Sequence, residues 1–275
     1  MTNSELQSFI INKIKTDVIN LSDKDFEGLY NRWFNNNPSI KYDFKKDLIS
    51  KKQGVPNGAY LLGVDLPYWF GDLNASNKKI MVIGIDPLRA ESAFNKINAN
   101  KKDDVLISTP YALHSEGNRN EEKNAYWAFI NELKSKHFVY LTDIYKTFFY
   151  INEPKRKRSY VYNSNKDNVK DVLRQTLYSE IEFIKPDVII TFGGIAYSQL
   201  MGKRCPKLSQ KLEKTKTHLK VTDDYSVAVL PFMHLSGSTR SKNLDNFLEE
   251  NNVTKEGTGR VGYGKAYAKL LKLFL

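Results

Sequence analysis

The chain has one cysteine and four histidines among its 275 residues, and it has no long hydrophobic run. Cys205 alone cannot form a disulfide, a four-thiolate iron–sulfur cluster or a cysteine-rich zinc site within one chain. His114 and His218 have no partners at metal-ligand spacing. The sequence therefore predicts no metal and no cofactor.

Other patterns are also missing. No apolar run approaches the length of a transmembrane helix, and the first residues lack the basic and apolar regions of a signal peptide. We therefore expect a cytoplasmic protein with no membrane association. A Gly-Lys-Ser/Thr loop, a Gly-x-Ser-x-Gly elbow and a Gly-x-Gly-x-x-Gly fingerprint are absent, which disfavours an unrelated α/β hydrolase or nucleotide-binding enzyme. Residues 257–265 look like a phosphate loop, but they follow no strand and predict only a lead-in to the last helix.

Positive charge, in contrast, is in excess. Lysine and arginine number 42 against 31 acidic residues, a net charge of +11 that suits nucleic acid or an acidic membrane surface. A genome rich in lysine codons would raise the same count without functional meaning. The basic run 154–158, with Tyr160 and Tyr162 close behind, is typical of a nucleic-acid groove, and Lys155 and Arg156 are its candidate DNA contacts. The alternative is a solvated loop.

Four short apolar runs predict the strands of one sheet, over residues 80–83, 137–144, 188–192 and 226–233. Amphipathic patterns predict helices at 4–21, from 22 or 23 to 33, and at 124–133, 168–184, 195–201, 243–250 and 263–275. Strands that alternate with helices predict an α/β fold, a three-layer α/β/α sandwich around a four-stranded, mostly parallel sheet. We expect a single domain over residues 1–275, with an N-terminal helical extension of about 1–53, and an ordered loop over 54–77.

Polar or glycine-rich residues follow each predicted strand. The first strand ends in Gly84-Ile85-Asp86-Pro87, the second in Asp143, the third in Gly193-Gly194 and the fourth in His234. The carboxyl ends of parallel strands share one edge of the sheet, so we expect Asp86, Asp143 and His234 to converge on one cleft. Each residue also has a structural alternative, since an aspartate can cap the next segment and a lone histidine is more often a hydrogen-bonded structural residue.

These motifs, in this order, resemble the uracil-DNA glycosylase superfamily. Gly84-Ile85-Asp86-Pro87 resembles its first motif and His234-Leu235-Ser236-Gly237 its last, while residues 185–193 are similar to its third-strand segment and 66–72 to its lead-in. The likeness covers most of residues 66–243. It implies the fold of that superfamily, DNA glycosylase activity without a cofactor, and single- or double-stranded DNA as the partner. We expect a monomer.

The resemblance implies a role for each catalytic residue. Asp86 positions the hydrolytic water and stabilises positive charge on the sugar, and His234 donates a hydrogen bond to the departing base. Gly84, Ile85 and Pro87 complete the substrate-binding motif around Asp86. Tyr111, with Ile107 as the alternative, stacks on the base.

The resemblance also implies DNA contacts in two loops. Backbone N–H groups of the paired glycines and the polar residues after the motif histidine hold the flanking phosphates; these residues are Gly193, Gly194, Ser236, Gly237 and Ser238. Arg240 or Leu235 fills the gap that the flipped base leaves.

One departure affects specificity. Asp143 stands where uracil-recognising members carry asparagine, and an ionised carboxylate accepts hydrogen bonds but donates none. A protonated carboxyl in a low-dielectric pocket would still accept uracil. The sequence therefore favours a DNA glycosylase that acts on a flipped uracil-like, damaged or modified base. The alternative is a catalytically inactive nucleic-acid-binding relative, against which the presence of both Asp86 and His234 argues.

Overall fold

A computed structural model of the protein describes residues 2–35, 40–43, 49, 59–74, 76–85, 87, 104–120, 122–151 and 169–275. Three residues with predicted roles, Asp86, Lys155 and Arg156, lie outside the described residues.

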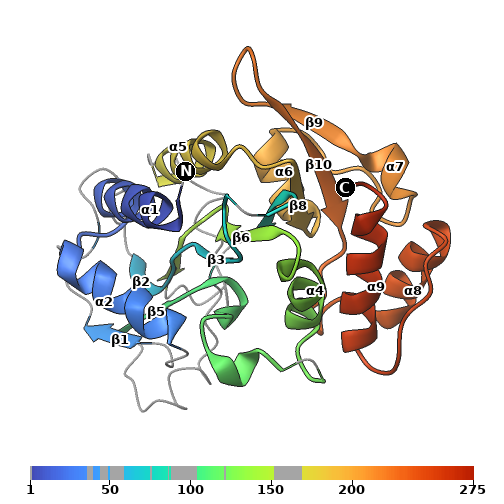
Figure 1. The fold of residues 1–275 in the computed structure, drawn as a ribbon, viewed down its shortest axis with the longest axis horizontal. Helices are drawn as coiled ribbons and strands as arrows, with labels where there is room; N and C mark the ends of the chain where they lie inside the picture. Colours follow the sequence, from blue (N-terminus) through green and yellow to red (C-terminus); the bar gives the residue numbers. More distant parts are fainter. Residues whose placement is uncertain are drawn as a thin grey trace.

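Within the described part of the chain, the central sheet has six strands in the order β3-β6-β4-β8-β10-β9 (Figure 1). Their bounds are β3 Tyr68–Phe70, β4 Lys79–Gly84, β6 Phe138–Asp143, β8 Val188–Phe192, β9 Thr217–Lys220 and β10 Ser226–Phe232. The inner four strands are the four predicted ones, and they pair in parallel as expected. The predicted size of the sheet is wrong, because β3 and β9 add an antiparallel strand at each edge.

A second sheet lies beside the first, in the order β1-β5-β2-β7. Its strands are β1 Ile40–Asp43, β2 Ala59–Asp65, β5 Asp104–Ser108 and β7 Thr147–Ile151. Since β2 and β3 both fall within the predicted loop at 54–77, that prediction is wrong for these residues. The Asp65 N–H donates to the Lys146 carbonyl at 2.9 Å, which ties β2 to the chain just after β6.

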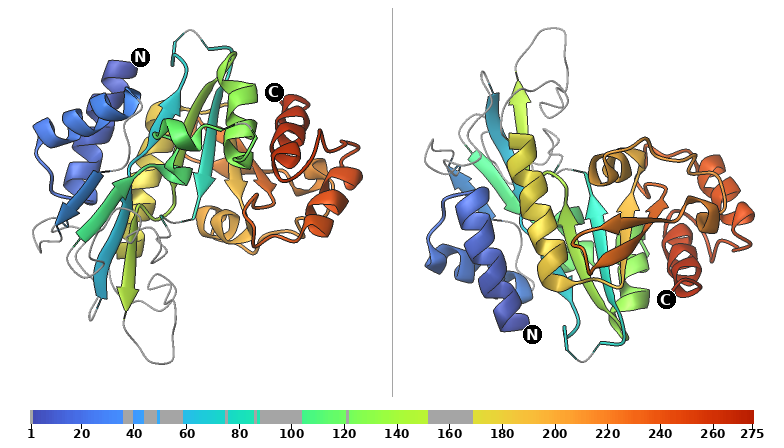
Figure 2. Two further views of the ribbon diagram at one scale, coloured as in Figure 1. Left: turned by 90° about the horizontal axis from the view of Figure 1, so that it is seen from below. Right: turned by 90° about the horizontal axis from the view of Figure 1, so that it is seen from above.

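Helices cover both faces of the central sheet, as Figure 2 shows. One face carries α4 Ala125–Lys134, α8 Ser241–Glu250 and α9 Val261–Lys272; the other carries α1 Asn3–Asp17, α2 Asp23–Phe34, α5 Val169–Ile184 and α6 Gly194–Met201. Successive residues of a strand face opposite sides of its sheet. In β4, therefore, Ile80 and Val82 join the hydrophobic cluster of α4, α8 and α9, while Met81 and Ile83 join the cluster of α1, α2 and α5.

The predicted helices are confirmed, and their caps explain where they begin. Ser22 caps α2, and Asn124 accepts hydrogen bonds from the Tyr126 and Trp127 N–H groups at the start of α4. At the start of α1, Thr2 and Glu5 form a capping box, so this helix begins one residue before the predicted helix at 4–21.

Helix α4 packs closely against α9. At the contact, a Cβ on Gly264 would overlap the Ala125 carbonyl oxygen. This close approach fixes the first turn of α4, which carries Tyr126 toward the carboxyl edge of the sheet.

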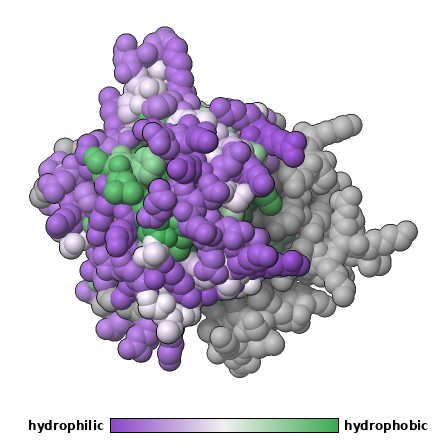
Figure 3. Space-filling model, turned by 90° about the vertical axis from the view of Figure 1, so that its right-hand side faces the viewer, coloured by the Kyte–Doolittle hydropathy of each residue, from purple (hydrophilic) through white to green (hydrophobic). Residues whose placement is uncertain are grey.

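The end of the molecule at α7 (Leu212–Thr215), α8 and α9 has a mostly hydrophilic surface with small hydrophobic areas (Figure 3). No helix among the described residues is long and apolar enough to cross a membrane.

Candidate active site at the carboxyl edge of the central sheet

The carboxyl ends of β4 and β6 bring Gly84 beside Asp143, its partner in the strand register. A Cβ at Gly84 would overlap Asp143 Oδ1 and would lie 3.2 Å from the Tyr111 hydroxyl oxygen. Position 84 therefore needs a glycine, because the Asp143 carboxyl leans across the end of β4. Pairing continues past the strand, since the Tyr145 N–H donates to the Ile85 carbonyl at 3.0 Å. Pro87 is buried next to this segment.

A buried ion pair supports the end of β6. Lys146 Nζ lies 2.9 Å from Glu180 Oε1, and both side chains are fully buried. Lys146 also donates to Thr142 Oγ1 at 2.9 Å and to the Asp143 carbonyl at 3.0 Å, while Thr142 Oγ1 donates to Glu180 Oε2 at 2.9 Å. Burial raises the pKa of the Glu180 carboxyl, and the Lys146 ammonium offsets part of that effect. The ion pair thus holds the backbone that presents Asp143.

Tyr111 lies against the same strand ends. Its φ of 58° is in the left-handed region, which a non-glycine residue adopts at some conformational cost. Burial raises the pKa of its hydroxyl well above the ordinary value, and Tyr126 and Asp143 add to the shift. The alternative stacking residue, Ile107, is fully buried within β5. Tyr111, and not Ile107, is therefore placed at the sheet edge.

His234 follows β10 and faces the end of β8. A Cβ at Gly193 would lie 3.8 Å from His234 Cδ2, so the carbon edge of the imidazole faces this glycine. His234 Nδ1 accepts a hydrogen bond from the Ser236 N–H at 3.1 Å, and therefore the ring proton of the neutral imidazole is on Nε2. Burial lowers the pKa of His234, which favours this neutral form at pH 7.

Tyr126 connects His234 to Tyr111. Its hydroxyl oxygen lies 2.7 Å from His234 Nδ1 and 3.2 Å from Nε2. Its ring stacks on Tyr111 with centroids 3.9 Å apart and an interplanar angle of 12°. The sequence pattern placed Tyr126 only on the apolar face of a helix, so this contact was missed.

Gly193 and Gly194 differ in whether their backbone N–H groups can bind an anion. Gly193 has a φ of 94°, and its N–H donates to the Phe232 carbonyl at 2.8 Å. Its predicted use as a phosphate donor is therefore wrong, because that hydrogen forms part of the β8–β10 connection. Gly194 begins α6, and none of the side chains that the structure describes hydrogen-bonds to cap this helix.

The loop after His234 departs from prediction at Leu235. This side chain is only 2% exposed and joins the core beneath α4 and α9, so it does not fit the predicted role of filling DNA. Gly237, Ser238 and Arg240 are exposed, and Ser236 is half-buried with its hydroxyl 2.6 Å from that of Ser238.

Arg260 braces this loop from the segment before α9. Its Nη2 donates to the Gly237 carbonyl at 3.4 Å and to the Thr239 carbonyl. Residues 257–260 lead into the last helix, as predicted. The sequence around Arg260 does not predict its hydrogen bond to Thr239, which lies 21 residues earlier.

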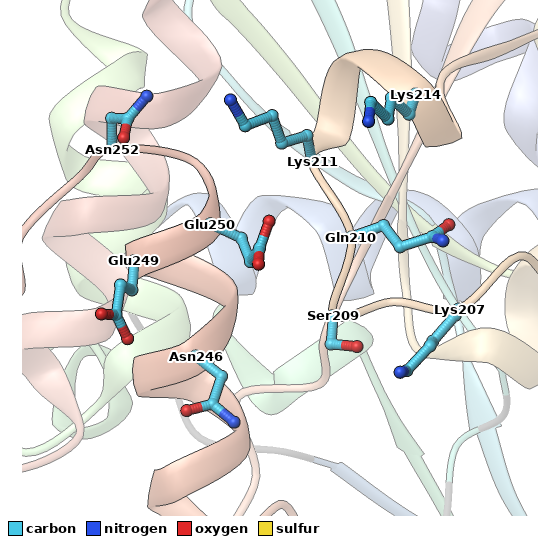
Figure 4. Close-up of a pocket in the computed structure, with 9 residues that line it drawn as sticks. All are labelled: Lys207, Ser209, Gln210, Lys211, Lys214, Asn246, Glu249, Glu250 and Asn252. Carbon is cyan, nitrogen blue, oxygen red and sulfur yellow. The ribbon is translucent and has the colours of Figure 1, made fainter.

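Of two pockets on the protein surface, one lies beside the site residues and the other lies away from them. One of about 460 Å³ lies beside Tyr126 and is also lined by Asn118, Lys123, Leu235 and Arg260. Another of about 690 Å³ lies between α8, with Glu249 and Glu250, and the lysine-rich segment 207–214 (Figure 4). Asp143, His234 and the other strand-end residues that the structure describes do not line this second pocket.

A mainly parallel central sheet with a carboxylate, a histidine and stacked aromatic rings at the carboxyl ends of its strands is typical of a ligand site in an α/β protein. A family model, the uracil DNA glycosylase superfamily, matches residues 70–256, from β3 to the segment beyond α8. The chain belongs to this superfamily, as the motifs predicted. Membership indicates a DNA glycosylase-type function and DNA as the substrate. No curated protein matches the chain.

Proposed function

We propose that this protein is a DNA glycosylase that hydrolyses the N-glycosidic bond of a base flipped out of DNA. The observation that carries the proposal is the tautomer of His234. The Ser236 N–H donates to Nδ1, so the imidazole carries its proton on Nε2 and can donate it to a base; in the free protein the Tyr126 hydroxyl lies 3.2 Å from this nitrogen. A glycosylase needs the base extruded because the glycosidic bond is out of reach inside the stack.

The chemistry separates charge between sugar and base. When the C1′–N bond breaks, its electron pair stays on the base, and the sugar becomes an oxocarbenium-like cation. His234 Nε2–H donates to an exocyclic oxygen of the departing base and stabilises its negative charge. Asp86 orients the water that adds hydroxide to C1′, and the remaining proton goes to the base. Removal of one such hydrogen-bond donor typically lowers the rate by about 10²–10³-fold.

Asp143 selects the base in this proposal. Its side chain is 3% exposed and lies at the strand end beside Gly84 and Tyr111. An ionised carboxylate only accepts hydrogen bonds, and this property favours a base edge that presents N–H groups over the carbonyl edge of uracil. The proposed substrate is therefore a damaged or modified base of that kind.

The exposed part of the site would hold the DNA backbone. We assign the phosphates to the Gly194 end of α6 and to Ser236 and Ser238, and the gap left by the base to Arg240. Lys155 and Arg156 remain further candidate contacts, which agrees with the net charge of +11.

A second candidate is a nucleic-acid-binding relative without turnover. One observation favours it: the Tyr126 hydroxyl oxygen lies 2.7 Å and 3.2 Å from the two ring nitrogens of His234. In a binder without turnover this contact would be permanent.

The test is base release from labelled oligonucleotides that carry uracil, hypoxanthine, xanthine or a modified cytosine, in single- and double-stranded form. His234→Ala and Asp86→Ala should each lower release from the preferred substrate by about 100-fold or more. His218→Ala, which changes an exposed histidine on β9, should leave release unchanged. No release by the wild-type protein, with salt-sensitive DNA binding retained, would refute the glycosylase and favour the binder.

A further inference from the structure

The Tyr126 ring sits in a cage of aromatic side chains. It stacks on Tyr111 at 3.9 Å, and Phe192 meets it edge-on at 5.2 Å with an interplanar angle of 87°. Offset stacking with an edge-on neighbour is a favourable arrangement for a planar ring. The cage therefore holds one flat six-membered ring against the predicted base-stacking residue.

The Tyr126 hydroxyl also lies against the ring nitrogens of His234. Gly193 faces the Cδ2 edge of the imidazole, and Tyr126 Oη lies 2.7 Å from Nδ1 and 3.2 Å from Nε2. The hydroxyl is therefore within hydrogen-bond distance of Nε2, the nitrogen that donates to the base in the proposed function. Burial raises the pKa of Tyr126, so the hydroxyl stays protonated and neutral like the exocyclic group of a base.

We infer that Tyr126 occupies the place of the flipped base in the free protein, and that a base binds only after this side chain turns out. The inference rests on the proposed function. A phenol ring with one exocyclic oxygen copies the two features of a base that this site recognises, a flat face for Tyr111 and an oxygen for His234. Each base must therefore displace Tyr126, which makes this residue a determinant of specificity.

The structure leaves room for that movement. Asn124 and the contact of α4 with α9 fix the backbone of Tyr126, so rotation of the side chain is the simplest route. The pocket of about 460 Å³ borders Tyr126 and lies between Asn118, Leu235 and Arg260. Its size is that of a small-molecule site, large enough for a phenol ring.

The experiment measures the binding of free bases, which needs no catalysis. Uracil, cytosine and hypoxanthine, which each carry an exocyclic oxygen, are titrated into wild-type protein and into Tyr126→Ala, and the His234 ring signals are followed by NMR, assigned with His234→Ala. Tyr178→Ala, which removes a half-buried tyrosine of α5, is the matched control. If the open state is populated about 10% of the time or less, Tyr126→Ala should bind a base about tenfold more tightly or better. The pKa of His234 should also rise toward its ordinary value, because water reaches the imidazole.

Two further variants separate the ring from the hydroxyl. Tyr126→Phe keeps the stacked ring and should give only part of the gain in affinity. Tyr126→Leu keeps apolar bulk on α4 and replaces Tyr126→Ala if that variant does not fold.

Loss of base binding in Tyr126→Ala and Tyr126→Leu would overturn the inference, since the base would then stack on Tyr126 itself. Unchanged affinity and an unchanged His234 pKa in these variants would also overturn it. Excision by the wild-type protein with unaltered base binding in the variants would refute this inference alone. Tighter base binding without excision of any substrate would refute the proposed glycosylase alone.

Discussion

Replacement of Lys146 by methionine should destabilise the protein strongly. Methionine keeps the apolar length of the lysine side chain and removes the ammonium. The ammonium lies 2.9 Å from Glu180 Oε1, and both side chains are fully buried. It also donates to Thr142 Oγ1 at 2.9 Å and to the Asp143 carbonyl at 3.0 Å. Lys146→Met therefore leaves a buried carboxylate without its counter-ion and two acceptors without a donor.

The expected cost follows from this geometry. Removal of one member of a buried ion pair typically costs about 3–5 kcal/mol in the free energy of unfolding, because the other charge stays in the interior uncompensated. A natural domain has about 5–15 kcal/mol in total, so the variant should be marginal. In Lys146→Met/Glu180→Gln the buried charge is gone, and at least half of the loss should be recovered.

Equilibrium unfolding in urea measures all three free energies. Lys220→Met is the matched control, because Lys220 lies only 2.6 Å from Asp223 but both side chains are exposed. That change should cost about 0–1 kcal/mol, as exposed ion pairs contribute little. A cost below about 1 kcal/mol for Lys146→Met would refute the reasoning. A double variant that loses the sum of its two single losses would refute it as well.

Two more predictions concern the strand ends. Gly84→Ala should lower base excision at least about tenfold in single-turnover assays, because the new Cβ overlaps Asp143 Oδ1 and displaces the carboxyl. Gly28→Ala is the control and should not lower excision, because its Cβ would lie 4.0 Å from Arg32. Equal activity in the two variants would contradict the placement of Asp143. Burial lowers the pKa of His234, so the unfolded chain binds this proton more readily, and the free energy of unfolding should decrease as the pH falls below the ordinary histidine pKa of about 6.5. Urea unfolding of the wild-type protein and of His234→Asn at pH 5 and pH 8 checks this prediction. The variant should lose part of the pH dependence of the free energy of unfolding, and an identical dependence in the two proteins would contradict it.

Much of the fold follows from local patterns in the sequence. The third predicted strand, 188–192, agrees with β8 at both ends, and the helices α2 and α4 begin next to Ser22 and Asn124. These predictions succeed because hydrophobic periodicity and capping are properties of neighbouring residues. The order of glycine, aspartate and histidine at successive strand ends was enough to predict the superfamily.

Other elements depend on partners far along the chain. Strand β3 has only three residues and exists through pairing with the distant strand β6. The second sheet likewise joins β2 to β5 and β7 across long separations. A short strand has little periodicity of its own, so β3 was predicted as part of a loop, and β5, β7 and β9 were not predicted as strands.

The residues of the site also divide into those predicted from local sequence patterns and those placed by contacts between distant segments. Sequence alone predicted that Asp143 and His234 would lie at one edge, because the edge of a parallel sheet is a consequence of strand order. Only the tertiary structure decided what surrounds them. It buried Leu235, used the Gly193 N–H within the sheet, and brought Tyr126, Lys146 and Arg260 to the strand ends. Periodicity determines which face of an element is apolar, whereas packing between distant segments determines which side chains meet. The proposed chemistry of the site depends on that packing.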